Sequence, residues 1–233
     1  MTSARYFGLI PAAGIGARMG AAIPKQYAEL AGKPMLMHVL ETFTQTPLIA
    51  HTFVVVSPED GYIDGTLATA GMQDHAGLSV LRVGGATRHD SVLHGLRTMR
   101  AQVNDDDWIL VHDAARPGLQ SSLIRHLIAA INDDEVGGLL AVPVVDTLKR
   151  ADAHHRAEQT VPREQLWAAQ TPQMFRYGLL RRALEQDINV TDEASAVESL
   201  GLKPKLVEGN TRNFKVTLPH DVALAEIYLR GQA

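Results

Sequence analysis

The sequence predicts an α/β protein in which a mostly parallel β-sheet is covered by helices on both faces. Short apolar runs of strand length alternate with segments whose apolar residues recur at helical spacing, which is typical of repeated strand–helix–strand units. A glycine-rich turn follows the first predicted strand, as it does in many nucleotide-binding sheets. The 233 residues, of which 45% are hydrophobic, are enough for one full core. We therefore expect a single domain over residues 1–233.

The elements can be assigned in chain order. The predicted strands of the first part are the apolar runs at 6–10, 51–57, 78–83, 107–112 and 138–144. A helix is expected at 34–44, with Pro34 at its first position and a buried apolar face. Two further helices are marked by the apolar stripes Val92, Leu96, Met99, Val103 and Leu123, Leu127, Ile128, Ile131.

The C-terminal part of the chain continues this pattern. We expect a helix near 177–186, a second helix in TDEASAVESLG capped by Thr191, and a final helix in HDVALAEIYLRG. PKLVEG and NFKVT are predicted to be short strands.

Residues 146–165 do not fit the alternation of strands and helices. They are polar and show neither a helical period nor a strand period. A polar excursion of about 20 residues is unusual inside a compact domain and indicates a functional or interaction element. The alternative is a surface loop without fixed structure.

Composition excludes several classes of function. The chain has no cysteine, so disulfides, zinc–thiolate sites and thiol nucleophiles are excluded. The net charge of −4 argues against broad binding to nucleic acid or anionic lipid. The ten histidines are scattered, so a histidine metal site is not expected. No apolar run reaches the roughly 20 residues of a membrane span, and the N-terminus lacks the apolar region of a signal peptide. We therefore expect a cytoplasmic protein.

The glycine-rich turn in LIPAAGIGARMGAAIPKQY fails two phosphate-binding templates. A P-loop needs Gly-Lys-Ser/Thr five residues after its first glycine, whereas Met19 follows Gly14 at that spacing. A dinucleotide fingerprint needs a third glycine, and its second strand should end in an acid rather than in Ser57. An NAD-dependent dehydrogenase is therefore not expected.

The rest of this stretch suits a triphosphate. Small residues from Pro11 to Gly14 allow consecutive backbone N–H groups to approach an anion, and Arg18 and Lys25 supply positive charge beside them. The alternative is an ordinary glycine-rich turn followed by two solvated cations.

Several segments in order resemble one enzyme family. PAAGIGARMG with PKQY, GGATRHDSV, VHDAARP, DTLKR, QTPQMF, TDEASAVE and NFKVT are together similar to the 2-C-methyl-D-erythritol 4-phosphate cytidylyltransferases of the non-mevalonate isoprenoid pathway. The resemblance runs from about Phe7 to the final helix. It implies a Rossmann-like sheet of the nucleotide-diphospho-sugar transferase type with a protruding dimerisation arm.

The resemblance also implies the reaction. A phosphate oxygen of the polyol phosphate attacks the α-phosphorus of CTP, which gives a CDP-alcohol and pyrophosphate. The nucleophile needs no enzymatic base, because a phosphate monoester with a second pKa near 6 is already largely ionised at neutral pH. Arg18 and Lys25 match the catalytic, transition-state-stabilising positions of the family. A divalent cation, expected to be Mg²⁺, would bind mainly through CTP phosphates.

Binding residues are carried over from the same motifs. For CTP they are Pro11, Ala12, Ala13, Gly14, Gly85, Ala86, Arg88, Ser91 and Ala114. For the polyol phosphate they are Arg163, Lys215, Thr147, Thr171, Asp113 and Arg116. Some relatives carry an acid at the position of Ala86, so a side-chain contact from that position is excluded here. Arg88 could instead brace its loop or lie on the surface.

Asp113 follows the end of a predicted strand, where open α/β sheets bind ligands. Its role could be to bind metal, ribose or a substrate hydroxyl, and the alternative is an acid that caps the following turn.

The polar segment receives a role from the resemblance. In the family it is an arm that crosses to a second subunit and helps to complete the active site there, so a functional homodimer is expected.

Other functions stay open at this point. A ribitol 5-phosphate cytidylyltransferase would share the CTP site and differ in the polyol pocket, whereas transferases that use UTP or dTTP fit GGATRHDSV and the arm less well. A non-catalytic nucleotide-binding module belongs to another class. It would have little reason to retain Arg18, Lys25, Asp113, Arg163 and Lys215 together.

Overall fold

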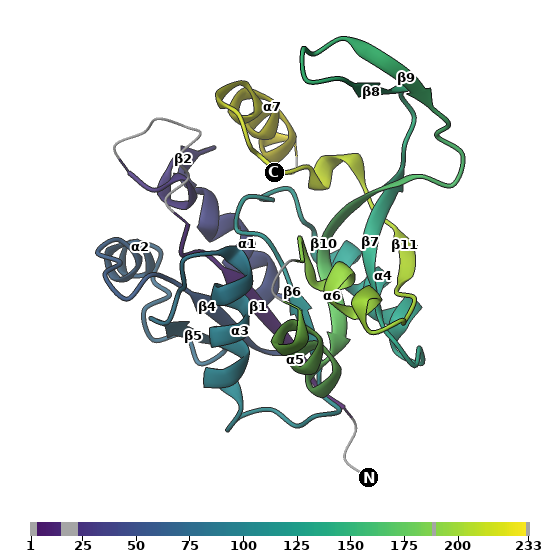
Figure 1. Ribbon diagram of the computed structural model, residues 1–233. Coiled ribbons are helices and arrows are strands. Elements are labelled where there is room, and N and C mark those ends of the chain that lie inside the picture. The colour runs from purple at the N-terminus through teal and green to yellow at the C-terminus, as the bar shows by residue number, and fades with distance from the viewer. Residues whose placement is uncertain (1–3, 15–22, 188–189, 232–233) are drawn as a thin grey trace.

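A seven-stranded sheet forms the centre of the computed structural model, which describes residues 4–14, 23–187 and 190–231 (Figure 1). The strand order is β11-β7-β10-β6-β1-β4-β5, and β10 alone among these strands runs antiparallel to its neighbours. The strands are β1 (Tyr6–Pro11), β4 (Ile49–Val55), β5 (Leu78–Leu81), β6 (Trp108–Val111), β7 (Gly138–Pro143), β10 (Trp167–Arg176) and β11 (Lys205–Glu208). The predicted mostly parallel α/β sheet is confirmed.

Helices cover both faces of this sheet. Apolar side chains of α1 (Met35–Thr44), α2 (Ile63–Thr69) and α4 (Ser121–Ile131) join the core on one face. Those of α3 (Arg88–Met99), α5 (Tyr177–Gln186) and α6 (Glu193–Ser199) join the core on the other. The last helix, α7 (Pro219–Arg230), packs in a third, smaller cluster beside a hairpin of β2 (Glu29–Leu30) and β3 (Lys33–Pro34).

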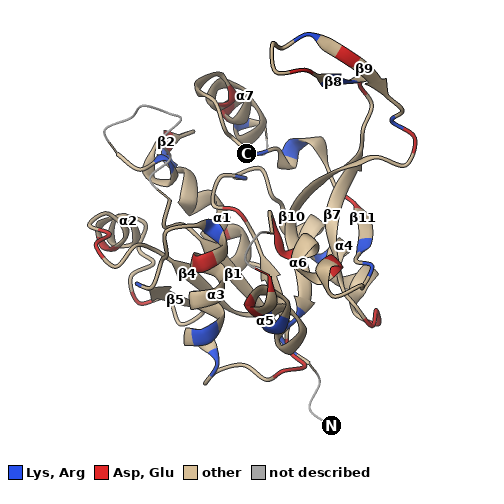
Figure 2. Cartoon of the chain, viewed as in Figure 1, with Lys and Arg blue, Asp and Glu red and all other residues tan. Residues whose placement is uncertain are grey.

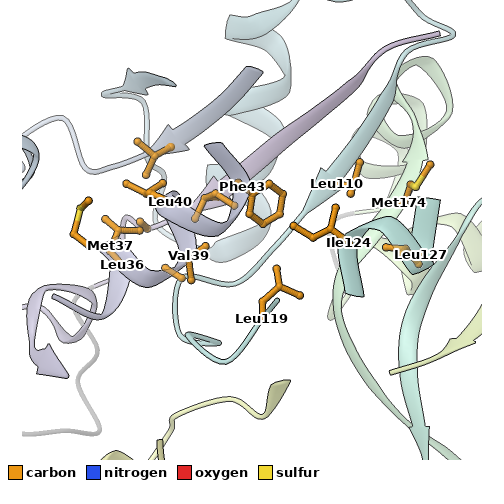
Figure 3. Packing of buried hydrophobic residues seen from close by; sticks show 14 of the residues in the cluster. Leu36, Met37, Val39, Leu40, Phe43, Leu110, Leu119, Ile124, Leu127 and Met174 are labelled. Atoms are coloured by element: carbon orange, nitrogen blue, oxygen red, sulfur yellow. The ribbon is translucent and has the colours of Figure 1, made fainter. Parts of the chain in front are cut away.

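Strand β1 contributes side chains to both main cores. Leu9 belongs to the core under α3 and Ile10 to the core under α1, because successive side chains of a strand point to opposite faces. Figure 3 shows part of the core under α1, where Phe43 of α1 lies between Leu40 of the same helix and Ile124 of α4. Gly8 is needed at this interface, since a Cβ at that position would lie 2.5 Å from Phe43 Cδ1.

Several element boundaries differ from those predicted. Pro34 precedes α1 with an extended ψ of 140° instead of forming its first turn. α3 ends at Met99, so Val103 is buried in the following loop. Asp192, not Thr191, caps α6, because its side chain accepts the Ser195 N–H at 2.9 Å. The predicted strand in NFKVT is absent. Instead, a 3₁₀ turn, η3 (Thr211–Asn213), precedes an irregular segment that leads to α7.

The longest strand of the sheet, β10, was not expected from the sequence. It contains Pro172, which cannot donate a ladder hydrogen bond, and its pairing with β7 is interrupted between Ala169 and Gln173. Buried polar residues Gln170, Thr171 and Gln173 also remove the apolar signal of a central strand.

Residues 146–165 contain a hairpin of β8 (Leu148–Ala151) and β9 (Ala157–Val161), which projects away from the main sheet in Figure 1. Asp152 closes its turn by accepting N–H groups of His154 and Arg156 at 2.8 and 2.9 Å. Nearly all of its side chains are exposed, so no apolar alternation was available to predict these strands. We call residues 146–165 the arm. It carries acidic and basic residues together (Figure 2).

No helix in the part of the chain that the structure describes is long and apolar enough to cross a membrane.

Candidate active site

A cavity of about 440 Å³ lies at the carboxyl ends of β1 and β6, where open α/β sheets bind their ligands. Its lining comes from four separate segments, which are the turn after β1, η2 (Lys25–Tyr27), the loop into α3 and the loop after β6, with Lys215 added from the segment before α7. The lining residues are Pro11, Ala12, Ala13, Gly14, Lys25, Gln26, Gly85, Ala86, Thr87, Arg88, Ser91, Asp113, Ala114, Ala115 and Lys215. All the residues predicted to bind CTP are among them.

The turn after β1 is held from both sides. The Ala12 N–H donates to the Val55 carbonyl at 2.7 Å, and the buried Gln26 amide donates to the Ala12 carbonyl at 2.7 Å. A Cβ built at Gly14 would meet none of the described residues within 4 Å, so they leave the space beside this glycine open to a ligand. Arg18 lies outside the described residues.

The loop into α3 is fixed by its own side chains. The Gly85 N–H donates to Ser91 Oγ at 3.1 Å, and that hydroxyl donates to the Thr87 carbonyl at 2.9 Å. Thr87 and Asp90 form a reciprocal capping box at the start of α3. Gly84 allows this loop to lie against the first one, because a Cβ there would be 2.2 Å from Ala13 Cβ. The two glycine-containing turns therefore form one continuous wall.

Lys25 projects into the cavity from η2 and donates to the Val216 carbonyl of the segment before α7. A proline, Pro24, precedes this short helix, which places Lys25 at its first position. The predicted catalytic lysine thus borders the same cavity as the glycine-rich turn that is predicted to bind the triphosphate.

Asp113 is the centre of a charged cluster. Its side chain is 10% exposed and lies 2.8 Å from Arg88 Nε, 2.8 Å from Lys215 Nζ and 3.7 Å from Arg116 Nε. Burial alone would raise the pKa of Asp113, but the positive charges of Arg88 and Lys215 outweigh burial and hold it well below the usual range. The carboxylate pairs with these cations instead of capping the turn, so the capping alternative is not what the structure shows.

Arg116 of this cluster and the neighbouring Thr171 do not line the cavity. Thr171 Oγ1 accepts the Asp113 N–H at 3.1 Å and is 2.9 Å from His112 Nδ1. Arg116 donates to the Asn213 carbonyl at 2.8 Å. In this chain both residues support the loop that carries Asp113.

Thr147 and Arg163 are exposed on the arm and contribute nothing to the cavity of their own chain. Arg163 donates to the Val145 carbonyl at the root of the arm. The structure therefore does not bring these two predicted polyol-phosphate residues to the rest of the site within one subunit.

Sequence reasoning missed three residues that line the cavity, which are Gln26, Thr87 and Ala115. Gln26 stands in the PKQY motif beside Lys25, and this position was the available signal. Within the described residues, no group of three or more His, Asp or Glu side chains could hold a metal ion.

Comparison with known proteins decides which family this site belongs to. The family model described as 2-C-methyl-D-erythritol 4-phosphate cytidylyltransferase matches residues 7–231. The chain belongs to this family. The cytidylyltransferase of Nitrosomonas eutropha is 54% identical over 98% of this chain and 98% of its own length. That of Dechloromonas aromatica is 51% identical over 98% of this chain and 99% of its own length.

A solved structure of a 4-diphosphocytidyl-2C-methyl-D-erythritol synthase superimposes with a TM-score of 0.86. It is 42% identical and covers 98% of this chain and 100% of its own. The predicted cytidylyltransferase family and fold are confirmed, and the roles of individual site residues stay predictions.

Proposed function

We propose that this protein transfers the cytidylyl group of CTP to 2-C-methyl-D-erythritol 4-phosphate, which gives 4-diphosphocytidyl-2-C-methyl-D-erythritol and pyrophosphate. Membership in the family supports this reaction. The observation that carries it at the level of residues is one cavity in which an open glycine turn at Gly14 faces Lys25, Asp113 and Lys215.

The site suits a displacement at phosphorus between two polyanions. A phosphate oxygen of the polyol phosphate forms the new bond to the α-phosphorus of CTP, and the bond from that phosphorus to the bridging oxygen of pyrophosphate breaks. Because the attacking phosphate is already ionised, the protein has only to position the reactants and stabilise the charge that develops. We assign that stabilisation to Lys25 and Arg18.

The second substrate is assigned to the Asp113 side of the cavity. Asp113 is ionised and held by Arg88 and Lys215 at 2.8 Å, with Arg116 farther away at 3.7 Å, so its remaining lone pairs can accept hydrogen bonds from polyol hydroxyls. Lys215 is 45% exposed and is therefore accessible to the incoming phosphate.

A divalent cation, which we propose to be Mg²⁺, would supply charge neutralisation at the triphosphate. Asp113 is the one carboxylate among the described lining residues, and it is already paired with cations. CTP phosphates and water are therefore the main ligands expected, which agrees with the preference of Mg²⁺ for phosphate over an all-protein cage.

We further propose a homodimer in which each arm serves the site of its partner. The exposure of Thr147 and Arg163, away from their own cavity, supports an exchange of arms. The test mixes inactive Lys25→Ala and Arg163→Ala proteins after dissociation and reassociation. In an equal mixture, random pairing makes about half of the dimers heterodimers, and each heterodimer has one intact site of two. About a quarter of wild-type activity should therefore return.

The matched control for this mixing mixes Lys25→Ala with the double variant Lys25→Ala/Arg163→Ala, which leaves no intact site and should stay inactive. No recovery in the first mixture would contradict the shared site.

The reaction itself is tested by pyrophosphate release from CTP, with Mg²⁺ present and absent. We expect release with 2-C-methyl-D-erythritol 4-phosphate and none with ribitol 5-phosphate. Release with ribitol 5-phosphate alone would favour the alternative polyol, and binding of CTP without release would indicate a non-catalytic module. The proposed substrates are small and water-soluble, which fits the predicted cytoplasmic location.

A further inference from the structure

A second buried carboxylate lies behind the charged cluster of the cavity. Glu193, the first residue of α6, is 1% exposed and faces the guanidinium of Arg88. Arg88 Nη1 and Nη2 donate to the two Glu193 oxygens at 2.7 and 2.9 Å, while Arg88 Nε donates to Asp113 Oδ1 at 2.8 Å. One guanidinium thus joins Glu193 to Asp113. A two-pronged pair of this kind fixes orientation as well as distance.

The position of Glu193 is itself fixed by the sheet. Gln173 of β10 accepts the Ala194 N–H at 2.7 Å and donates to Asp192 Oδ2 at 2.8 Å. Gln173 pairs in register with Val111 at the end of β6, just before the loop that carries Asp113. The start of α6 is therefore held at the same edge of the sheet as the cavity.

The charges along this connection compensate one another. Burial alone would lower the pKa of Arg88, but the Glu193 and Asp113 carboxylates outweigh burial and raise it above its ordinary value. Arg88 therefore stays charged, with a buried carboxylate on each side. The charge of Arg88 is balanced by two buried carboxylates, whereas the more exposed Lys215 pairs with Asp113.

We propose that Glu193 is a positioning residue which, through Arg88, holds the Asp113 carboxylate in the orientation that receives the second substrate. The proposal rests on the function proposed above. Without the Glu193 charge, Arg88 has only Asp113 as a carboxylate partner and is free to turn towards the phosphates of CTP. Asp113 then loses its fixed orientation.

The test is a double-mutant cycle with Glu193→Gln and Asp113→Asn, measured by steady-state kinetics for each substrate. Glu193→Gln keeps the side-chain shape and removes the charge. We expect kcat/KM for the polyol phosphate to fall about 10- to 100-fold, in line with the loss of a hydrogen bond to a charged group, with a smaller change in KM for CTP. In the Asp113→Asn background, Glu193→Gln should lower kcat/KM for the polyol phosphate less than about twofold, because the carboxylate that Glu193 positions is no longer there.

The matched control is Glu198→Gln, an exposed glutamate on the same helix, which should leave both constants unchanged. If Glu193→Gln fails to fold, Glu193→Asp takes its place, since it keeps the charge and shortens the side chain. The fall in kcat/KM that Glu193→Asp causes should also disappear in the Asp113→Asn background. Multiplicative losses in the double variant would overturn the proposal, because they would mean that Glu193 acts independently of Asp113.

Hydrogen exchange at Arg88, which can be measured without enzyme activity, tests the positioning role of Glu193 separately from the proposed function. The Arg88 Nε–H resonance, assigned by its loss in Arg88→Lys, should exchange with solvent faster in Glu193→Gln than in wild type. An unchanged exchange rate overturns the positioning role. Inactivity of the wild-type protein towards CTP and both polyol phosphates, with the exchange effect present, would instead refute only the proposed function.

Discussion

Lowering the pH from about 7 to about 5 should destabilise the protein by about 2 kcal/mol through His112 alone. The His112 ring is fully buried, against Phe43 at 5.6 Å between ring centres. Its Nε2 lies 3.2 Å from the Arg116 carbonyl, and its Nδ1 lies 2.9 Å from Thr171 Oγ1. Both nitrogens are therefore used by a neutral imidazole, with Nε2 as donor and Nδ1 as acceptor.

The magnitude follows from the pKa of this group. Burial lowers the pKa of His112 to about 3, although the neighbouring Asp113 opposes the shift. An ordinary histidine has a pKa of about 6.5, so below that pH His112 binds a proton in the unfolded chain but stays neutral in the folded chain. Stability must then rise with pH between about 3 and 6.5, at about 1.4 kcal/mol per unit. Over the 1.5 or so units between pH 6.5 and 5, this gives about 2 kcal/mol.

The assay is urea unfolding across this pH range, on wild type and on His112→Gln, which cannot titrate. His38 and His51 also have pKa values lowered by burial and contribute with the same sign, but they are present in both proteins. The difference in pH dependence between the two proteins therefore isolates His112. His126→Gln, at an exposed histidine, is the matched control and should behave as wild type. Equal pH slopes for wild type and His112→Gln would refute a buried neutral His112.

Four further predictions concern the site. Lys25→Ala should lower kcat about 10²- to 10³-fold and weaken CTP binding much less, and equal losses in turnover and in calorimetric affinity would reduce Lys25 to a binding residue. Gly14→Ala should leave the melting temperature unchanged, because the added methyl meets none of the described residues, and should raise KM for CTP, because the methyl enters the space proposed for the triphosphate. Gly84→Ala should instead destabilise by about 1 to 3 kcal/mol in thermal unfolding, since its Cβ would lie 2.8 Å from the Val56 carbonyl oxygen. A chelator should abolish pyrophosphate release without changing the melting temperature of the nucleotide-free protein, and a lowered melting temperature would point to a metal site in the protein itself.

The sheet was largely predictable because most of its strands are buried on both faces and are short apolar runs. β1, β4 and β6 follow this rule, and the helices between them carry apolar stripes. β10 was missed because its stabilisation comes from neighbours that only the fold provides. Gln173, for example, is tolerated in the core since its amide is satisfied by Asp192 and Ala194.

Some parts of the candidate site could likewise be predicted from the sequence, and others could not. Lys25 and the glycine-rich turn from Pro11 to Gly14 are close in sequence. The turn geometry that an anion requires can therefore be predicted from local residues. The partners of Asp113 could not be predicted from spacing, because Arg88 and Lys215 approach it from separate segments. Glu193 had no recognisable role in the sequence, since an acid at the start of a helix is common.

The sequence by itself determined the α/β class and the exclusion of thiol chemistry, and it placed the glycine-rich turn after the first strand, because each depends on residue type or local periodicity. Family resemblance added the expected reaction. Only the tertiary structure decided that Glu193, Arg88, Asp113 and Lys215 form one connected set of charges. The physical reason is that the pairing of buried charges depends on distances of about 3 Å between side chains, and the packing of α3, α6 and β6 into one shared core sets those distances.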